Sequence, residues 1–180
     1  MTQGACPERA QRVEAWLAAH LELIARGQPV LDVAAGRGRH AIFLAEHGWS
    51  VHAVDRNADA IAALDEHARS HGLPIRTSCI DLETGDVNLG SEQYGTVLVF
   101  NYLHRPLVPA LVRALRPGGV LLYETFTARQ RERGHPRNPA FLLEDGELPR
   151  LVQPLVVLDQ REGEFDGRFI ASVAARKPLP

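Results

Sequence analysis

A glycine-containing turn between two short apolar runs constrains the fold of this chain more than any other feature. The runs, 29–33 and 50–54, have the length of buried strands, and apolar residues over 41–45 recur at the spacing of one helical face. The turn Gly36-Arg37-Gly38 separates the first run from that helix. This order predicts a strand, a tight turn, a helix and a second strand that runs parallel to the first.

The two glycines of the turn suit a place where a ligand meets the backbone. Gly36 can adopt a positive φ, and neither Gly36 nor Gly38 carries a β-carbon that would keep a ligand away. The helix that follows directs free N–H groups and its positive end to the same place. Asp55 stands at the tip of the second strand, where a carboxylate can accept hydrogen bonds from both hydroxyls of a ribose. The unit therefore predicts a nucleoside site.

Asp32 bears on which nucleoside is bound. Gly36, Gly38 and Ala41 also match the glycine fingerprint of dinucleotide-binding proteins. A carboxylate inside the first strand would repel a pyrophosphate, whereas it would attract the ammonium or sulfonium group of S-adenosylmethionine. The alternative is that Asp32 hydrogen-bonds the backbone of the turn, as short polar side chains often do.

Two segments resemble a known family. The segment VLDVAAGRGRHAIFLAEHGWSVHAVD (30–55) resembles the first motif and second strand of class I S-adenosylmethionine-dependent methyltransferases, and LRPGGVLLYETF (115–126) is similar to their turn into the fifth strand. In the family pattern D-x-G-x-G-x-G, Ala34 stands at the first glycine. Within the class, GRGRHAIFLA and the short length resemble the small bacterial tellurite-resistance and thiopurine-type enzymes.

The resemblance implies an α/β fold, with a Rossmann-like, mostly parallel seven-stranded sheet, helices on both faces and a C-terminal antiparallel hairpin. It implies one methyltransferase domain over 1–180. Its parts would be an N-terminal helix over the cofactor mouth (1–28), a cofactor-binding core (29–125), a basic lid-like loop (126–150) and the hairpin (151–180). The last strand would insert between the fifth and the sixth.

S-adenosyl-L-methionine is the cofactor that the resemblance implies. The residues expected to contact it are Asp32, Ala34, Gly36, Gly38, Asp55, Arg56, Asp81, Leu82 and Asn101. Asp81 and Leu82 follow a predicted third strand, 74–80, where the family has an acidic residue that accepts from the adenine amine and a neighbour that packs on the base. An aspartate after a strand can also be a turn residue.

Substrate-facing groups are expected after the fourth predicted strand, 94–100, because open α/β folds place their chemistry at the carboxyl ends of strands. For an OH or NH acceptor, His104 would be the base, with Tyr102 or Asn101 orienting the acceptor. A soft nucleophile, such as a thiolate or a chalcogen oxyanion, needs no base. His104 could equally cap the next helix. Glu124, after the fifth strand, is a candidate base or cation site, with a structural role as the alternative.

A basic segment, 127–138, is a candidate for binding substrate. It carries four arginines and His135, with Glu132 as its one acidic residue. Arg129, Arg133 and Arg137 are the predicted substrate contacts, because guanidinium groups bind carboxylates and oxyanions well. The hypothesis is a lid that selects a small anionic substrate, and the alternative is a solvated loop.

Composition narrows the function classes. The chain has 180 residues and a formal net charge of −2, which fits one globular domain and disfavours nucleic acid as a partner. No apolar run has membrane-spanning length, and 1–11 lacks a signal-peptide core, so a cytoplasmic location is expected. Cys6 and Cys79 have no paired spacing, which gives no support to a disulfide or a metal site, and Cys79 is expected in the core.

Three further elements are predicted from local patterns. An amphipathic helix is expected over 8–26, and the alternative to a place over the cofactor mouth is that it packs on the sheet. A helix capped by Asn57 is expected to run to about residue 70, and another is expected over 106–115. After a tight turn at 116–119, the hairpin strands are expected at 154–160 and 165–175, with their turn around 162–164.

The function expected from these observations is S-adenosylmethionine-dependent methylation of a small-molecule acceptor, either an anion or a soft sulfur, selenium or tellurium nucleophile. Two alternatives stay open. A Rossmann-type NAD(P)-dependent oxidoreductase shares the glycine turn and Asp55, although it would need a substrate domain for which this chain has little room. A non-catalytic S-adenosylmethionine-binding protein would carry the same sequence features as the enzyme.

Overall fold

The computed structural model describes residues 13–85 and 87–180, which form one sheet with helices around it. The strands are β1 (Val30–Val33), β2 (Val51–Asp55), β3 (Ile75–Cys79), β4 (Tyr94–Phe100), β5 (Leu115–Phe126), β6 (Val156–Phe165) and β7 (Arg168–Arg176). The α-helices are α1 (Ala15–Ala19), α2 (Arg39–Glu46), α3 (Ala58–His71), α4 (Val108–Ala114) and α5 (Glu147–Leu151). Short 3-10 turns are η2 (Leu21–Leu23), η3 (Arg105–Leu107), η4 (Ala128–Glu132) and η5 (Pro139–Phe141).

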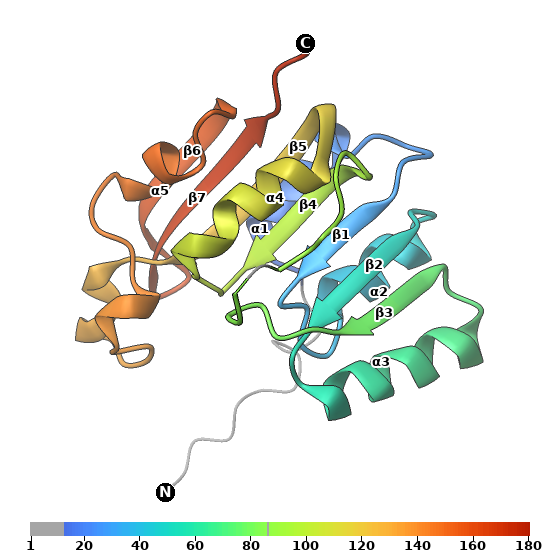
Figure 1. Ribbon diagram of the computed structural model, residues 1–180. Helices are drawn as coiled ribbons and strands as arrows, with labels where there is room; N and C mark the ends of the chain where they lie inside the picture. The colour runs from blue at the N-terminus through green and yellow to red at the C-terminus, as the bar shows by residue number, and fades with distance from the viewer. Residues whose placement is uncertain (1–12, 86) are drawn as a thin grey trace, which may run out of the picture.

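The seven strands follow the order β3-β2-β1-β4-β5-β7-β6 (Figure 1). Neighbouring strands from β3 to β5 pair in parallel, and β7 is antiparallel to both β5 and β6. The predicted mostly parallel sheet, with the last strand inserted beside the fifth, is therefore confirmed. Because β1 to β5 run in one direction, their carboxyl ends meet at one edge of the sheet.

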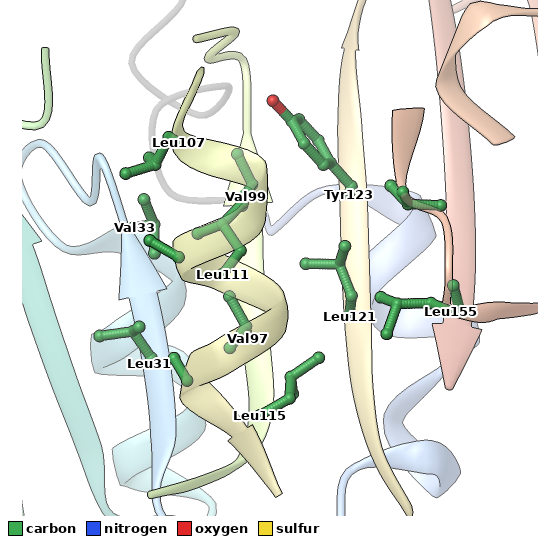
Figure 2. Packing of buried hydrophobic residues seen from close by; sticks show 14 of the residues in the cluster. Leu31, Val33, Val97, Val99, Leu107, Leu111, Leu115, Leu121, Tyr123 and Leu155 are labelled. Carbon is green, nitrogen blue, oxygen red and sulfur yellow. The ribbon is translucent and has the colours of Figure 1, made fainter. Parts of the chain in front are cut away.

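Successive residues of a strand point to opposite faces of the sheet, so the apolar strands present apolar side chains on both faces. Helices cover each of these faces. On one face Leu31 and Val97 pack with Leu111 of α4, as Figure 2 shows. On the other face Val30 and Leu98 belong to a cluster with α1, α2 and α3. Every residue of β4 is buried, as expected for a central parallel strand.

The crossover predicted from the glycine turn is present. Strand β1 pairs in parallel with β2, with Val30 opposite Val51, and α2 lies between them in the chain. The next helix, α3, begins as predicted, because Asn57 Oδ1 accepts a hydrogen bond from the Ala60 N–H at 3.1 Å. The order of elements from β1 to α3 thus follows the local sequence signals.

The helix predicted over 8–26 is wrong beyond Ala19, and 8–12 lies outside the described residues. The His20 ring Nδ1 lies 2.8 Å from the Trp16 carbonyl oxygen, the acceptor that a continuing helix would bond through its backbone. The His20 N–H instead donates to the Leu17 carbonyl at 3.1 Å, a 3-10 arrangement. The chain then turns through η2.

Three smaller predictions are also corrected. The hairpin turn lies at Asp166-Gly167, both with positive φ, so residues 162–164 belong to β6. Residues 116–119 bulge out within β5, since the pairing with β4 passes directly from Leu115 to Val120. Cys79 is exposed because it ends β3, an edge strand of the sheet.

Candidate functional site

A cavity of about 550 Å³ opens at the carboxyl edge of the parallel strands. This size is typical of a site for a small molecule or cofactor. It lies where open α/β sheets bind their ligands. The residues that line it are Ala34, Asp55, Arg56, Leu82, Glu83, Asn101, Tyr102, Leu103, Phe126, His135, Pro136 and Phe141.

The glycine turn after β1 contains three left-handed residues. Ala34, Gly36 and Gly38 have φ angles of 56°, 56° and 77°. A β-carbon at Gly38 would collide with the Leu64 side chain, whereas one at Gly36 would meet nothing within 4 Å. Gly38 is therefore required for packing on α3, while Gly36 leaves open space. Ala34 keeps the conformation for which the family pattern has glycine.

Asp55 joins this turn to the start of α3. Its Oδ2 accepts a hydrogen bond from the Gly36 N–H at 2.7 Å, and its Oδ1 accepts from the Asn57 N–H at 2.8 Å. A carboxylate oxygen can accept a second bond, so both oxygens keep capacity for hydroxyl donors from the cavity. The side chain is thus fixed by backbone groups while it lines the cavity.

Asp32 is a buried carboxyl behind the turn, in β1. It is 1% exposed, and its Oδ2 has no hydrogen-bond partner within the described part of the chain. Burial raises the pKa of Asp32 to about 7, against the opposing effects of the Ala41 N–H and of Arg39. A buried carboxyl oxygen without a hydrogen-bond partner is costly. A cationic ligand group nearby would offset that cost, which is the chemistry expected for a sulfonium or ammonium group.

Of the two residues expected to contact adenine, Leu82 lines the cavity and Asp81 does not. Leu82 is 4% exposed. Asp81 is not among the lining residues, and its Oδ1 accepts a hydrogen bond from the Glu83 N–H at 3.0 Å, which is the geometry of a turn residue. Arg56 lines the cavity 3.6 Å from Glu83, with 66% of its side chain exposed.

Asn101 lines the cavity and belongs to a polar network around the buried Glu14. Its Nδ2 donates to Glu14 at 3.0 Å, and its Oδ1 accepts from Arg168 at 3.3 Å. Glu14 also accepts from Arg39 at 2.8 Å and from Arg168 at 3.1 Å. Although burial opposes it, these partners leave the pKa of Glu14 lowered. The network fixes the N-terminal segment to the starts of α2 and β7.

The structure separates the four expected catalytic residues into two pairs. Asn101 and Tyr102 line the cavity, whereas His104 and Glu124 do not. His104 lines a separate cavity of about 170 Å³ and, although it precedes η3, its side chain makes no capping hydrogen bond. Glu124 is fully buried and accepts from Ser172 at 2.6 Å and from Arg161 at 2.9 Å. The catalytic roles of His104 and Glu124 stay predictions that this placement does not favour.

Tyr102 presents a polar atom at the cavity. Its hydroxyl is buried without a hydrogen-bond partner among residues 13–85 and 87–180. Burial, with Glu83 as the next cause, raises the pKa of Tyr102 to about 12. Tyr102 therefore keeps its proton at neutral pH and can act as a hydrogen-bond donor.

The three arginines predicted to bind substrate are not among the lining residues. The Arg129 guanidinium lies 4.2 Å from the centroid of the Phe169 ring, and Arg133 pairs with Glu164 at 2.8 Å. Arg137 is exposed. The arginine lid stays a prediction, and these contacts do not support it.

Residues 126–141 instead supply lining residues that the sequence prediction did not name. These are Phe126 at the end of β5, His135, Pro136 and Phe141. Phe126 could have been found, because it closely follows the predicted fifth strand, at the edge where ligands bind. The loop residues carry no periodic signal. Glu14 was missed for a similar reason, since its partners are distant in sequence.

Among the described residues, no group of three or more His, Cys, Asp or Glu side chains is placed to hold a metal ion. No helix in the same part of the chain is long and apolar enough to cross a membrane.

An open, mostly parallel sheet with a glycine turn after β1 and a carboxylate at the tip of β2 defines the class of nucleotide-type α/β cofactor domains. Within that class, the family described as "Methyltransferase domain" matches residues 30–119, half of the chain. The chain belongs to this family. The resemblance seen in the glycine-turn and fifth-strand motifs is thereby confirmed.

One curated relative is the probable S-adenosyl-L-methionine-dependent methyltransferase TehB of Haemophilus influenzae, 29% identical over 87 residues. That match covers 48% of this chain and 30% of TehB, so the chain spans less than a third of that relative.

Two solved structures show the shared fold. A SAM-dependent methyltransferase from Methanosarcina mazei has a TM-score of 0.75 at 18% identity, with 90% of this chain and 98% of that chain covered. The second is the 1,6-didemethyltoxoflavin-N1-methyltransferase of Burkholderia thailandensis, which was solved with bound 1,6-didemethyltoxoflavin and S-adenosylhomocysteine. It has a TM-score of 0.68 at 22% identity. There the coverage is 91% of this chain and 76% of that chain.

Proposed function

We propose that this protein is an S-adenosylmethionine-dependent methyltransferase that acts in the cytoplasm on a small-molecule acceptor. The observation that carries the proposal is the buried carboxyl of Asp32 behind the glycine turn, whose Oδ2 has no hydrogen-bond partner among the described residues, together with Asp55 at the cavity. A carboxylate at Asp32 favours a cation and disfavours a pyrophosphate. The net charge of −2 supports an acceptor other than a nucleic acid.

Each residue proposed to contact the cofactor has a distinct task. Asp55 accepts hydrogen bonds from the ribose hydroxyls, and Leu82 packs on the base. Gly36 leaves room for the methionine part, and Asp32 offsets its positive charge. When bound, the cofactor supplies a methyl group on a sulfonium for in-line attack by the acceptor.

The remaining task of the chain is to orient the acceptor and to exclude water. The apolar side chains of Leu103 and Phe126 line the cavity and serve the second purpose. The Tyr102 hydroxyl, which stays protonated, can donate a hydrogen bond to the acceptor. No residue of the protein needs to carry the methyl group.

The narrower hypothesis, a small anion or a soft sulfur, selenium or tellurium nucleophile, stays a prediction. The resemblance of GRGRHAIFLA to tellurite-resistance enzymes supports a soft nucleophile, and Arg56 at the cavity supports an anion. The exposure of Arg56 and its neighbour Glu83 weaken the case for the anion, because water and the carboxylate both screen the guanidinium charge.

Calorimetric titration with S-adenosylmethionine, S-adenosylhomocysteine and NAD⁺ tests the cofactor. We expect the two adenosyl compounds to bind and NAD⁺ not to bind. Binding of NAD⁺ alone would contradict the proposal and favour an oxidoreductase. Transfer of a labelled methyl group to an acceptor then separates an enzyme from a protein that only binds the cofactor.

A further inference from the structure

The outer half of the cavity has a different character from the cofactor half. Ala34, Asp55 and Leu82 come from the ends of β1, β2 and β3, where the cofactor is proposed to bind. The opposite side is formed by Phe126 and Phe141, together with neighbouring apolar side chains. The residues of this side are distant in sequence from the glycine turn. This side is the place left for an acceptor.

Phe141 is held at the cavity by hydrogen bonds from Arg105 to its backbone neighbours. Arg105 donates to both carboxylate oxygens of Glu147, at 2.6 and 2.8 Å. The same guanidinium donates to the carbonyls on either side of Phe141, those of Ala140 at 3.2 Å and Leu142 at 2.9 Å. The Phe141 ring, 44% exposed, is therefore presented at the cavity by a fixed backbone rather than by a free loop.

Phe126 is placed by the same segment. The Leu143 N–H donates to the Phe126 carbonyl at 2.9 Å, and the Ala128 N–H donates to the Leu143 carbonyl at 2.8 Å. Leu143 is fully buried. Two aromatic rings that are distant in sequence thus line one cavity through a short stretch of backbone pairing.

His135 is the imidazole of this half. Its carbonyl accepts from Gln130 Nε2 at 3.1 Å, and Gln130 Oε1 accepts from the Phe169 N–H of β7 at 2.8 Å. Gln130 is 6% exposed, so a buried side chain holds the backbone of His135 to the sheet. Imidazole is the side chain used most often to take a proton in catalysis.

Apart from Arg56, which lies beside Glu83 on the cofactor side, the arginines near the outer half are engaged elsewhere. Arg129 stacks on Phe169, Arg133 pairs with Glu164, and Arg105 pairs with Glu147. None of these three guanidinium groups lines the cavity.

We propose that the outer half binds a flat aromatic or heteroaromatic acceptor between Phe126 and Phe141, and that His135 takes the proton of its OH, NH or SH group. This inference rests on the proposed methyltransferase function and narrows its substrate class. Aromatic rings pack favourably on aromatic side chains. Tyr102 donates a hydrogen bond that orients the acceptor.

The reaction balances as follows in atoms and charge. The acceptor heteroatom forms a bond to the methyl carbon, and the carbon–sulfur bond breaks with its electron pair remaining on sulfur. The acceptor proton moves to a ring nitrogen of His135. The imidazolium that results carries the positive charge that the sulfonium loses, and it releases the proton to water when the products leave.

The test compares catechol, 8-hydroxyquinoline and thiophenol with tellurite, selenite and acetate as acceptors, with release of S-adenosylhomocysteine as the readout. We expect turnover of the aromatic compounds. His135→Ala should lower kcat for catechol about a hundredfold. It should change kcat for thiophenol little at mildly alkaline pH, because the thiol is already ionised. Glu132→Gln, an exposed change in the same segment, is the matched control.

A binding measurement tests the ring site without turnover. Guaiacol, a methylated catechol, is titrated into protein saturated with S-adenosylhomocysteine. Phe141→Ala should weaken guaiacol binding by about tenfold or more. Leu158→Ala, at a similarly exposed apolar side chain on β6, should not. Thermal unfolding shows that both variants fold.

Three outcomes would overturn the inference: turnover of the oxyanions or acetate in preference to all three aromatic compounds, no turnover of any aromatic compound, or full catechol turnover in His135→Ala. In each case calorimetric binding of S-adenosylhomocysteine shows whether the cofactor assignment survives. Loss of that binding in the wild type would instead count against the methyltransferase proposal itself.

Discussion

The two sides of the cavity are built by different means. On the side of β1 and β2, backbone geometry does the positioning: left-handed residues shape the turn, and Asp55 is fixed by two backbone N–H groups. On the side of residues 126–141, buried or paired side chains hold the backbone in place, through the Arg105–Glu147 pair and the amide of Gln130, in addition to the backbone pairing at Phe126. The first arrangement tolerates few substitutions, whereas the second can change its lining residues and keep its supports.

This difference fits two different tasks. A cofactor common to many enzymes needs one fixed set of contacts, and backbone groups provide it whatever the neighbouring side chains are. An acceptor that differs from enzyme to enzyme needs a wall whose shape can change. Function then depends on the site grafted on the fold rather than on the fold itself.

The largest effect is expected from Asp55→Ala. The change removes both oxygens that are proposed to accept from the ribose hydroxyls, and S-adenosylmethionine affinity should fall about a hundredfold in calorimetry. Because the carboxylate also bonds Gly36 and Asn57, the free energy of unfolding should fall by about 1–2 kcal/mol. Asp59→Asn, an exposed carboxylate change in the first turn of α3, is the control. Unchanged affinity in Asp55→Ala would remove the ribose assignment.

Replacing each of the two glycines of the turn by alanine should lower the stability of the protein by different amounts. Alanine at either position has an unfavourable φ, at about 1 kcal/mol. Gly38→Ala should lower the free energy of unfolding by about 2–3 kcal/mol in urea, because its β-carbon also meets Leu64, and Gly36→Ala by only about 1 kcal/mol. In a Leu64→Ala background the two penalties should become equal. Equal penalties in the wild-type background would show that the turn relaxes, contrary to a backbone-fixed wall.

The pH dependence of cofactor binding tests Asp32. A bound cation favours the ionised carboxylate, so binding releases a proton below the raised pKa of about 7. Affinity for S-adenosylmethionine should therefore rise about tenfold from about pH 6 to about pH 8. His40 does not contribute, because burial lowers its pKa to about 4 and it stays neutral in this range.

Asp32→Asn is the matched variant for this measurement, since it keeps the shape and cannot ionise. Its affinity should be flat over the same range. A wild-type affinity that is equally flat would mean that Asp32 does not interact with the cofactor cation.

The smallest effect is expected from Arg129→Ala and Arg133→Ala. Their guanidinium groups contact Phe169 and Glu164 rather than the cavity, so the KM for the acceptor should change by less than about twofold. Arg150→Ala on α5 provides the reference for loss of one surface charge. A tenfold rise in KM for either variant would restore the arginine lid and with it an anionic acceptor.

How far the sequence predicts the structure differs between the same two regions. The strand, turn, helix and strand around Gly36, and the cap at Asn57, follow from residues that lie close together in the chain. The hairpin turn was also within reach, because Asp166-Gly167 is a strong local signal, and it was missed in favour of a glycine four positions earlier.

The acceptor side could not be predicted in the same way, because its side chains find partners far along the chain. Arg129 meets Phe169 across the sheet, and Arg105 meets Glu147. Local pattern cannot show that a charged loop has its charges already engaged. For the same reason it placed His104 at the cavity, where the structure has His135.

The position of β7 has a consequence for how the molecule is made. Among the described residues β6 pairs with β7 alone, and β7 lies between β6 and β5 in the sheet. During synthesis β6 emerges earlier and has no place to dock until 168–176 follows. The last two strands are thus synthesised out of spatial order, and we expect this part of the sheet to close after the parallel strands β1 to β5.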